Sequence, residues 1–504
     1  MPIRYEIYRG GQRAIDFPLV SPMAIAPESV PVPSERPIVL RDGTFNVEFK
    51  DQATGAALLW DAGAPGELIL ETTRLPSRAK PHNLNVELAR FRLMRMLQKI
   101  EDWGLFDLPA AQELVSRVRL LQAEFGSALE SLADGGAAAT LADEVLAKAI
   151  TLGDELVLFN ADLTLNRRKT QNSFARYVFG CRVDWTLRNQ KVKDLLADNF
   201  DYAVLPMTWK LLQPKEDTFD TAAMDEWVEF LTRRRVPIIA GPIIDLGDSA
   251  MPDWAYIWEN DVDTLRDLMV DFIRKMVTRY RRAVAVWNVV GGLHANSIPG
   301  LGFEQTIELT RLLVAQVKSM LPQARTLVTI KDPFGEHHAT KTPGVPPMLY
   351  ADTIAQAGVN CDGFGLEIET GVPRVGGYTR DLFQLSCVID KLSGTGKPLY
   401  ITAISAPSRN TPDSGDHSEG TMDPSKAGRW RGPWSPEIQA DWLEGVSKIA
   451  LGKPFVESVT WGNLTDANAT VPGGGLVDDL FRPKLAFERL KTLRATYQRR
   501  DKKA

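Results

Sequence analysis

Val284-Ala-Val-Trp-Asn-Val-Val-Gly-Gly292 and Pro398-Leu-Tyr-Ile-Thr-Ala-Ile-Ser405 are the two stretches that decide the fold of this chain. Each is a nearly continuous apolar run, which is typical of a strand buried on both faces of a parallel sheet. Residues 262–282 and 302–320, which flank the first stretch, have apolar residues at helical spacing. This alternation predicts parallel strands that are joined by helices.

The same alternation continues from about residue 176 to residue 497. Eight strands are expected, at 177–183, 202–207, 236–244, 284–291, 326–334, 363–370, 398–405 and 456–463. Helices are expected at 222–234, 262–282, 302–320, 382–392, 436–451 and 483–497. Eight such units predict an α/β fold of the (β/α)8 TIM barrel type. An open doubly wound sheet fits less well, because no glycine-rich dinucleotide loop follows the first strand.

The chain ahead of the barrel has two different patterns. Residues 1–75 contain short apolar runs split by Asp-Gly, Thr-Gly and Pro-Gly turns, which predicts a small β-sandwich. Residues 84–170 have helical spacing and predict three helices, with 135–139 as a loop before the third. The predicted domains are therefore a β-sandwich at 1–80, a helical connector at 81–172 and the barrel at 173–504.

Composition and charge exclude several classes of protein. The 504 residues are 44% hydrophobic and carry a net charge of −5, which favours neither nucleic acid nor an anionic membrane surface as a partner. The sequence has no stretch of about 18 apolar residues and no apolar signal core, so we expect a cytoplasmic protein. Three distant cysteines fit neither a disulfide framework nor a zinc site, and no cofactor or metal is expected.

Six segments resemble, in chain order, segments of glycoside hydrolase family 10, which contains retaining xylan hydrolases. They are Phe179-Gly-Cys-Arg-Val183, Met207-Thr-Trp-Lys-Leu-Leu-Gln-Pro214, Trp287-Asn-Val-Val290, Asp362-Gly-Phe-Gly-Leu-Glu-Ile-Glu369, Thr460-Trp-Gly-Asn-Leu-Thr-Asp466 and Arg482-Pro-Lys-Leu-Ala-Phe487. The resemblance implies a barrel that acts on β-1,4-xylan-type glycosides. The front of the chain is similar to accessory regions of some bacterial members, which implies a carbohydrate-binding-like role for residues 1–80.

The sequence differs from that family at the two positions where the family has its catalytic glutamates. The resemblance implies a general acid/base at Gly292 and a nucleophile at Ala403, and neither side chain can hold a proton or attack an anomeric carbon. Retaining hydrolysis needs two carboxyl groups about 5–5.5 Å apart. We therefore expect a barrel of this kind that has lost both catalytic glutamates.

Glu367 and Glu369 are the best remaining carboxylate pair. Residues i and i+2 of a strand point to the same side, so both side chains should face the cleft. They could act as a relocated acid and base, or share a proton because one pKa is raised. They could also hold a hard cation with Asp332 or Asp245, or form ion pairs with Lys331 or a loop arginine.

Side chains at the C-terminal ends of barrel strands build the active sites of such barrels. This rule selects the rim candidates Asp245, Asn288, His294, Lys331, Asp332 and Asp466. His294 is a candidate acid/base or a cap of the next loop, and His337-His338 are candidate ligands or surface residues.

Aromatic side chains present apolar faces that suit sugar C–H surfaces. The candidates for stacking are Trp209, Trp287, Trp461, Trp430 and Trp434, and barrel packing is the alternative for Trp287 and Trp461. Trp430 lies between Arg429 and Arg431 on the long polar loop 405–433, where His417 and Glu419 are candidates for a replacement acid.

The sequence therefore predicts a protein that binds a poly- or oligosaccharide at the C-terminal face of its barrel without cleaving it. The alternative is a diverged glycoside hydrolase that acts on O-glycosyl bonds through Glu367 and Glu369. No nucleic acid and no membrane is expected as a partner.

Overall fold

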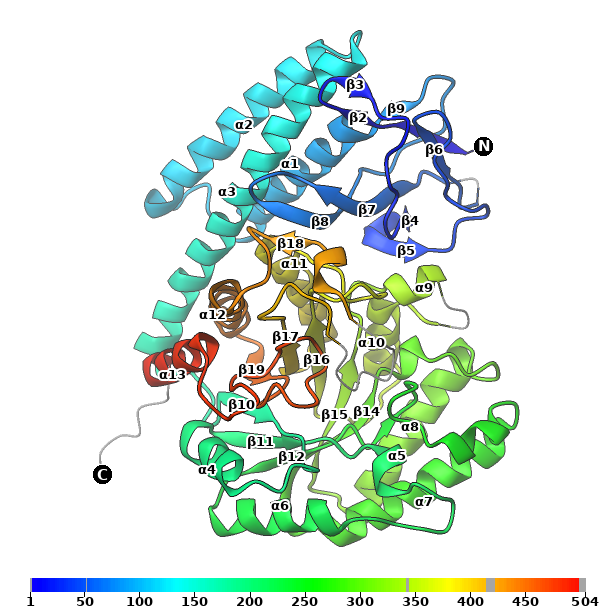
Figure 1. Ribbon diagram of the computed structural model, residues 1–504, viewed down its shortest axis with the longest axis vertical. Helices are drawn as coiled ribbons and strands as arrows, with labels where there is room; N and C mark the ends of the chain where they lie inside the picture. Colours follow the sequence, from blue (N-terminus) through cyan, green and yellow to red (C-terminus); the bar gives the residue numbers. More distant parts are fainter. Residues whose placement is uncertain (1, 51, 341–343, 414–421, 498–504) are drawn as a thin grey trace.

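A closed parallel barrel forms the C-terminal part of the computed structural model, which describes residues 2–50, 52–340, 344–413 and 422–497 (Figure 1). Its strands are β10 Phe179–Arg182, β11 Tyr202–Leu205, β12 Ile238–Ala240, β13 Ile244–Asp245, β14 Val284–Gly291, β15 Arg325–Ile330, β16 Gly363–Glu369, β17 Leu399–Ser405 and β19 Val456–Trp461. All of them pair in parallel, and pairing of β12 with β14 closes the ring. The predicted (β/α)8 barrel is confirmed.

Most strands differ from their predicted bounds by a few residues, and two larger departures have local reasons. The third, predicted as 236–244, is split into β12 and β13 at Gly241-Pro242, because proline has no N–H for the ladder and Gly241 has a φ of 115°. The fifth ends at Ile330 rather than at residue 334, because Asp332 has a φ of 40°, outside the extended region. Lys331 and Asp332 are thus on the loop that leaves the barrel.

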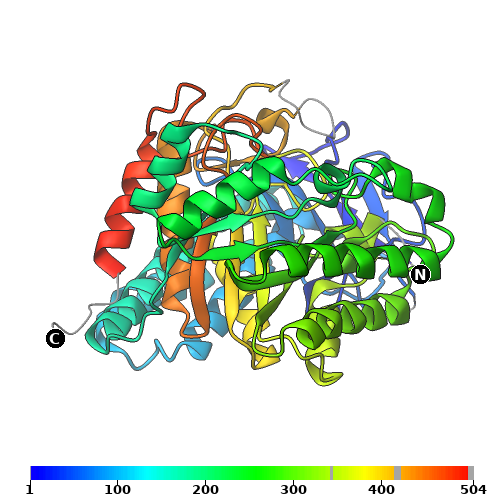
Figure 2. The same cartoon turned by 90° about the horizontal axis from the view of Figure 1, so that it is seen from below.

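Helices surround the ring of strands (Figures 1 and 2). They are α4 Gln190–Asn199, α5 Trp209–Leu212, α6 Ala222–Arg233, α7 Val262–Tyr280, α8 Phe303–Met320, α9 Glu336–Thr340, α10 Pro347–Gln356, α11 Leu382–Leu392, α12 Pro436–Gly452 and α13 Leu485–Tyr497. Their buried faces and the strands share one apolar core. No helix in the described part of the chain combines the length and the apolar character that crossing a bilayer requires.

Sheets of the N-terminal part are consistent with a small sandwich. One contains β1 Ile3–Glu6, β6 Thr44–Val47 and β9 His82–Asn83, and a hairpin joins β2 Tyr8–Arg9 to β3 Gln12–Arg13. The larger sheet has the order β18-β8-β7-β4-β5, with β4 Met23–Ala26, β5 Val30–Val32, β7 Gly55–Asp61, β8 Gly66–Glu71 and β18 Arg429–Trp430. Its edge strand β18 therefore comes from the barrel segment, between β17 and α12.

The three predicted helices are present as α1 Leu84–Asp102, α2 Gln112–Glu130 and α3 Gly135–Thr170. The loop predicted at 135–139 is wrong, because the Asp134 side chain accepts hydrogen bonds from Gly136 N and Ala137 N and starts the helix there. α3 runs from the N-terminal sheets down the side of the barrel, where it packs against α12 (Figure 1).

Buried polar contacts join these helices to α11 of the barrel. Asp390 on α11 is shared by Lys99 of α1, at 2.8 Å, and by Lys453, at 2.7 Å. Asp154 of α3 accepts hydrogen bonds from Leu382 N and Phe383 N at the start of α11. The helices and the barrel are therefore packed against each other, and the domain boundaries at residues 80 and 172 stay predictions.

Candidate functional site

Four charged side chains at the C-terminal end of the barrel form a chain that we call the mouth network: Asp245, Lys331, Glu367 and Arg182. Lys331 Nζ lies 2.5 Å from Asp245 Oδ2 and 3.9 Å from Glu367 Oε2. Arg182 Nη1 lies 3.3 Å from Glu367 Oε1, and Arg182 Nε donates to the carbonyl of Gly462. Three of the predicted residues thus meet, and the network links β10, β13 and β16 across the mouth.

Glu367 is a charged carboxylate in this setting. Burial acts to raise its pKa, but the charges of Lys331 and Arg182 outweigh burial and leave the pKa below its usual value. Glu369 forms a separate ion pair with Arg374. Of the roles considered for the pair, ion pairing is the one that the structure contains, and a proton shared by raising the pKa of Glu367 does not fit.

A hard-cation site at these carboxylates also finds no support. Within the described residues, no group of three His, Cys, Asp or Glu side chains has the arrangement needed to hold a metal ion. Two basic side chains already neutralise Glu367, so a divalent cation beside it would meet like charge.

Gly292 follows β14 directly, and Ala403 lies two residues before the end of β17. Gly292 has a φ of 67° and ψ of 20°, a left-handed conformation that a side chain disfavours. A Cβ at Gly292 would lie 2.9 Å from Lys331 Cδ, so Lys331 already occupies the adjacent space. Ala403 is 1% exposed and pairs with Glu367 across the two strands.

We expect Gly292→Ala to lower the free energy of unfolding by about 2 kcal/mol, from backbone strain and the contact with Lys331. Gly358→Ala is the matched control, because Gly358 has a φ of 68° and a methyl group added there would meet no atom within 4 Å. The control should cost about 1 kcal/mol in urea denaturation, from strain alone. Equal losses would show that Lys331 does not restrict residue 292.

Comparison with known proteins places this barrel beside one family. Residues 167–301 match the family model of glycosyl hydrolase family 10. The barrel resembles that family. The matched residues include β14 and Gly292 and end before Ala403, and the match itself assigns no catalytic position. The loss of the acid/base at Gly292 and of the nucleophile at Ala403 both stay predictions.

Among solved structures, the chain is similar to two xylanases and to a protein described as GH10. Xylanase 10B from Thermotoga petrophila RKU-1 in complex with xylobiose is 17% identical, with 63% of this chain and 94% of that chain covered and a TM-score of 0.48. The GH10 protein from Paenibacillus barcinonensis is 17% identical, with coverage of 66% and 98% and a TM-score of 0.47. Xylanase10C from Cellvibrio japonicus is 11% identical, with coverage of 65% and 72% and a TM-score of 0.49.

His294 lies beneath the mouth of the family 10-like barrel rather than in it. Its ring is fully buried, stacks on Tyr350 at 5.1 Å and makes a 2.8 Å hydrogen bond through Nε2 with the carbonyl of Lys331. Burial, with a smaller contribution from His337, lowers the pKa of His294 to about 3. The acid/base role predicted for His294 does not fit, because a buried neutral ring can neither reach substrate nor supply a proton at neutral pH.

The lowered pKa of His294 predicts a pH dependence of stability. The unfolded chain, with a histidine pKa near 6.5, binds a proton that the folded state excludes, so stability is present above about pH 6.5 and falls as the pH drops toward 3. Between pH 7.5 and pH 5 this one residue should account for about 2 kcal/mol. The free energy of unfolding should be measured by denaturation at both pH values. Its loss between pH 7.5 and pH 5 should be smaller by that amount in His294→Gln than in the unaltered protein, and an equal loss would contradict the buried neutral ring.

Asn288, Asp332 and the histidine pair are held by neighbouring groups. Asn288 Oδ1 accepts from Thr329 Oγ1 at 2.9 Å, and Asp332 Oδ2 lies 2.8 Å from His337 N and 2.7 Å from His337 Nδ1. His338 Nδ1 makes a hydrogen bond with the carbonyl of Gly344. The Asn288 contact joins β14 to β15, and the contacts of Asp332 and His338 fix the loop after β15. They do not bring the two histidines together as ligands.

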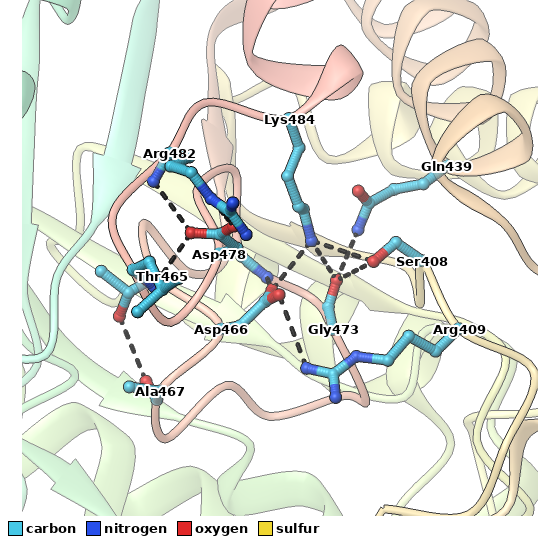
Figure 3. A network of polar contacts seen from close by, with 12 residues as sticks. Ser408, Arg409, Gln439, Thr465, Asp466, Ala467, Gly473, Asp478, Arg482 and Lys484 are labelled. Atoms are coloured by element: carbon cyan, nitrogen blue, oxygen red, sulfur yellow. Dashed lines mark hydrogen bonds and ion pairs between the residues drawn. The ribbon is translucent and has the colours of Figure 1, made fainter.

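Asp466 is the centre of a second polar cluster, shown in Figure 3. Its carboxylate is paired with Lys484 Nζ at 2.8 Å and Arg409 Nη2 at 3.5 Å, and it accepts a hydrogen bond from Gly475 N. Its side chain is only 5% exposed. Asp466 therefore fastens the loops after β17 and β19 to each other, and little of it is open to a sugar.

The five candidate tryptophans are in the interior. Trp209, Trp287 and Trp461 are at most 1% exposed and belong to the barrel core. Trp430 and Trp434 are 1% and 2% exposed. The stacking role predicted for these two does not fit their burial. β18 carries Trp430 into the N-terminal sheet, where its indole N–H donates to Asp154 Oδ2, and Trp434 belongs to the barrel core. His417 and Glu419 lie outside the described residues.

Sequence reasoning missed residues that the structure places at the mouth. Arg182 ends β10, so the rule on strand ends would have selected it had it been applied to the first strand. The loop after β13 contains the short helix Asp253–Trp258, with Trp254, Tyr256 and Trp258 partly exposed. Aromatic residues at every second position of 254–258 were the signal that could have found them.

Proposed function

We propose that the family 10-like barrel binds a poly- or oligosaccharide at its mouth and does not cleave it by double displacement. The observation that carries this proposal is the position of Lys331. Its alkyl chain fills the space beside Gly292, and its ammonium lies between Asp245 and Glu367. A cation and a glycine thus stand where the resemblance expects the general acid/base.

The lowered pKa of Glu367 supports the same proposal. Glycoside hydrolysis needs a protonated carboxyl group to assist the leaving oxygen, and such groups have raised pKa values. The pKa of Glu367 is lowered instead, since Lys331 and Arg182 outweigh its burial. The carboxylate of Glu367 is therefore suited to accept hydrogen bonds from hydroxyl groups rather than to donate a proton.

The mouth also has polar side chains that can bind sugar hydroxyl groups and aromatic residues that can contact sugar C–H groups. Lys331 and Arg374 are 31% and 35% exposed at their side chains, so they remain able to meet a ligand's hydroxyl oxygens. Trp254, Tyr256 and Trp258 follow β13 at the same end of the barrel, where each packs against the barrel core and is partly exposed. The exposed parts of these side chains are the apolar surface that we expect to meet sugar C–H groups. A glycan is the class of ligand that combines both requirements.

Calorimetric titration with xylan, glucan and mannan oligosaccharides tests this proposal. We expect saturable binding of at least one glycan and an affinity about two- to tenfold weaker in Tyr256→Ala, because a lost stacking contact is worth about 0.5–1.5 kcal/mol. Ile257→Ala is the control, since Ile257 is the exposed neighbour of Tyr256 at 73%. Absence of binding to every glycan, or equal weakening in both variants, would contradict the proposal.

A diverged glycoside hydrolase is the second candidate function. It is favoured by the placement of Glu367 and Glu369 at the C-terminal end of β16, with side chains 17% and 13% exposed. Under this alternative, substrate would have to displace Arg374 or Lys331 from a carboxylate before either could act.

A further inference from the structure

A pocket of about 280 Å³ lies at the opposite end of the barrel from the mouth, where β10, β11 and β12 begin. Four arginines line it, Arg176, Arg234, Arg235 and Arg494, with Asp201 as the one acidic residue among its lining. Tyr177 and Phe200 add aromatic surface to its wall. So many guanidinium groups around one hollow are a strongly positive feature on a chain whose net charge is −5.

Asp201 balances only one of the four arginines, Arg494, with which it forms an ion pair at 2.8 Å. Oδ2 accepts hydrogen bonds from Val178 N and Phe179 N at 3.0 and 2.9 Å, and Oδ1 accepts from Arg494 Nε at 2.8 Å. Its side chain is 9% exposed. Asp201 therefore anchors the start of β10 and holds Arg494 through its Nε.

The other three arginines differ in whether a carboxylate balances their charge. Arg234 is paired with Asp194 and Asp198 of α4. Arg176 lies over the ring of Tyr177 at 5.3 Å, and neither Arg176 nor Arg235 has a carboxylate partner anywhere in the part of the chain that the structure describes. Two guanidinium charges at the pocket are thus left without a counter-charge.

Arg235 also has an unfavourable backbone. It follows the C-terminus of α6 with a φ of 57°, while Val236 N donates to Leu231 O and Arg235 N to Thr232 O. This is a Schellman ending, in which the left-handed residue is usually glycine, and a side chain there costs about 1–2 kcal/mol. Glycine would adopt this conformation at lower cost, so replacing Arg235 with glycine should stabilise the fold while it removes the guanidinium group.

We propose that this pocket binds a phosphate-bearing small molecule. The planar fork of a guanidinium group matches two phosphate oxygens, and several forks around one hollow suit an anion with more than one charge. The ligand is either inorganic phosphate or a phosphate ester, and both present the same oxygens to Arg176 and Arg235. The inference does not depend on glycan binding at the mouth.

Calorimetric titration with inorganic phosphate and with a hexose phosphate, at ionic strength held constant with chloride, tests this site. We expect saturable binding, weakened at least tenfold in Arg176→Gln and in Arg235→Gly. Arg235→Gly should also raise the melting temperature, because glycine relieves the left-handed strain, so loss of binding in that variant could not be ascribed to unfolding.

Arg233→Gln is the matched control, since Arg233 is the last residue of α6, two positions before Arg235, lies outside the pocket and is 3.9 Å from Glu229. Its affinity should equal that of the unaltered protein. Tighter binding of the hexose phosphate would assign an organic ligand, and equal affinities would assign the phosphate group alone. No saturable binding of either probe, or affinities unchanged in both pocket variants, would overturn the proposal.

Discussion

Asp390→Asn should lower the free energy of unfolding by about 3–5 kcal/mol in guanidinium denaturation at pH 7. The substitution leaves Lys99 and Lys453, each with a side chain 9% exposed, without the carboxylate that they share. Burial already holds the pKa of Lys453 below its usual value despite Asp390, so this amine loses its main charge partner. A buried ammonium without a counter-charge is among the costliest defects that one substitution can create.

The matched control is Asp102→Asn. Asp102 lies 3.3 Å from the same Lys99 Nζ, but its side chain is 43% exposed, so its loss should cost less than about 1 kcal/mol. A small effect of Asp390→Asn, similar to that of the control, would contradict the buried ionic junction between α1, α11 and Lys453.

Trp430→Ala should also lower the free energy of unfolding by about 3–5 kcal/mol. The ring is 1% exposed, its N–H donates to Asp154 Oδ2 at 2.8 Å, and its backbone pairs with Gly66 of β8. Removing the ring leaves a cavity between the N-terminal sheet and the barrel and takes a donor from a buried carboxylate.

Trp430→Phe separates the two contributions. It retains most of the packing and loses only the hydrogen bond to Asp154, so the expected cost is about 1–3 kcal/mol. Neither variant should change the affinity for a glycan by direct contact. A Trp430→Ala protein of unchanged stability with weakened glycan binding would instead restore the stacking role expected from the sequence.

The barrel was predictable because its signal is local. Alternation of apolar runs with helical spacing located all eight strands, and the ends of α11 at 382 and 392 agree with the sequence pattern. The errors were also local in origin. Gly135 and Gly136 indicated a loop, whereas the cap supplied by Asp134 makes them the first turn of a helix.

The candidate site was less predictable because it depends on contacts between distant segments. The rule on strand ends found Asp245, Lys331 and Glu367, which do meet. Burial of Trp430 could not be foreseen, since it follows from a strand pairing between residues 66–67 and 429–430, more than 360 positions apart. The predicted acid/base role of His294 was wrong for a similar reason, because the ring of Tyr350 that covers it comes from α10.

The most direct test of the central claim is chromatographic detection of sugars released from xylans, glucans, mannans and aryl glycosides. The protein and its Glu367→Gln/Glu369→Gln variant would be incubated in parallel at high concentration, with binding of each glycan measured on the same samples. A mouth that binds without double displacement predicts saturable binding by the protein and no release by either. Release by the protein that disappears in the variant would contradict that account and assign catalysis to the two glutamates of β16.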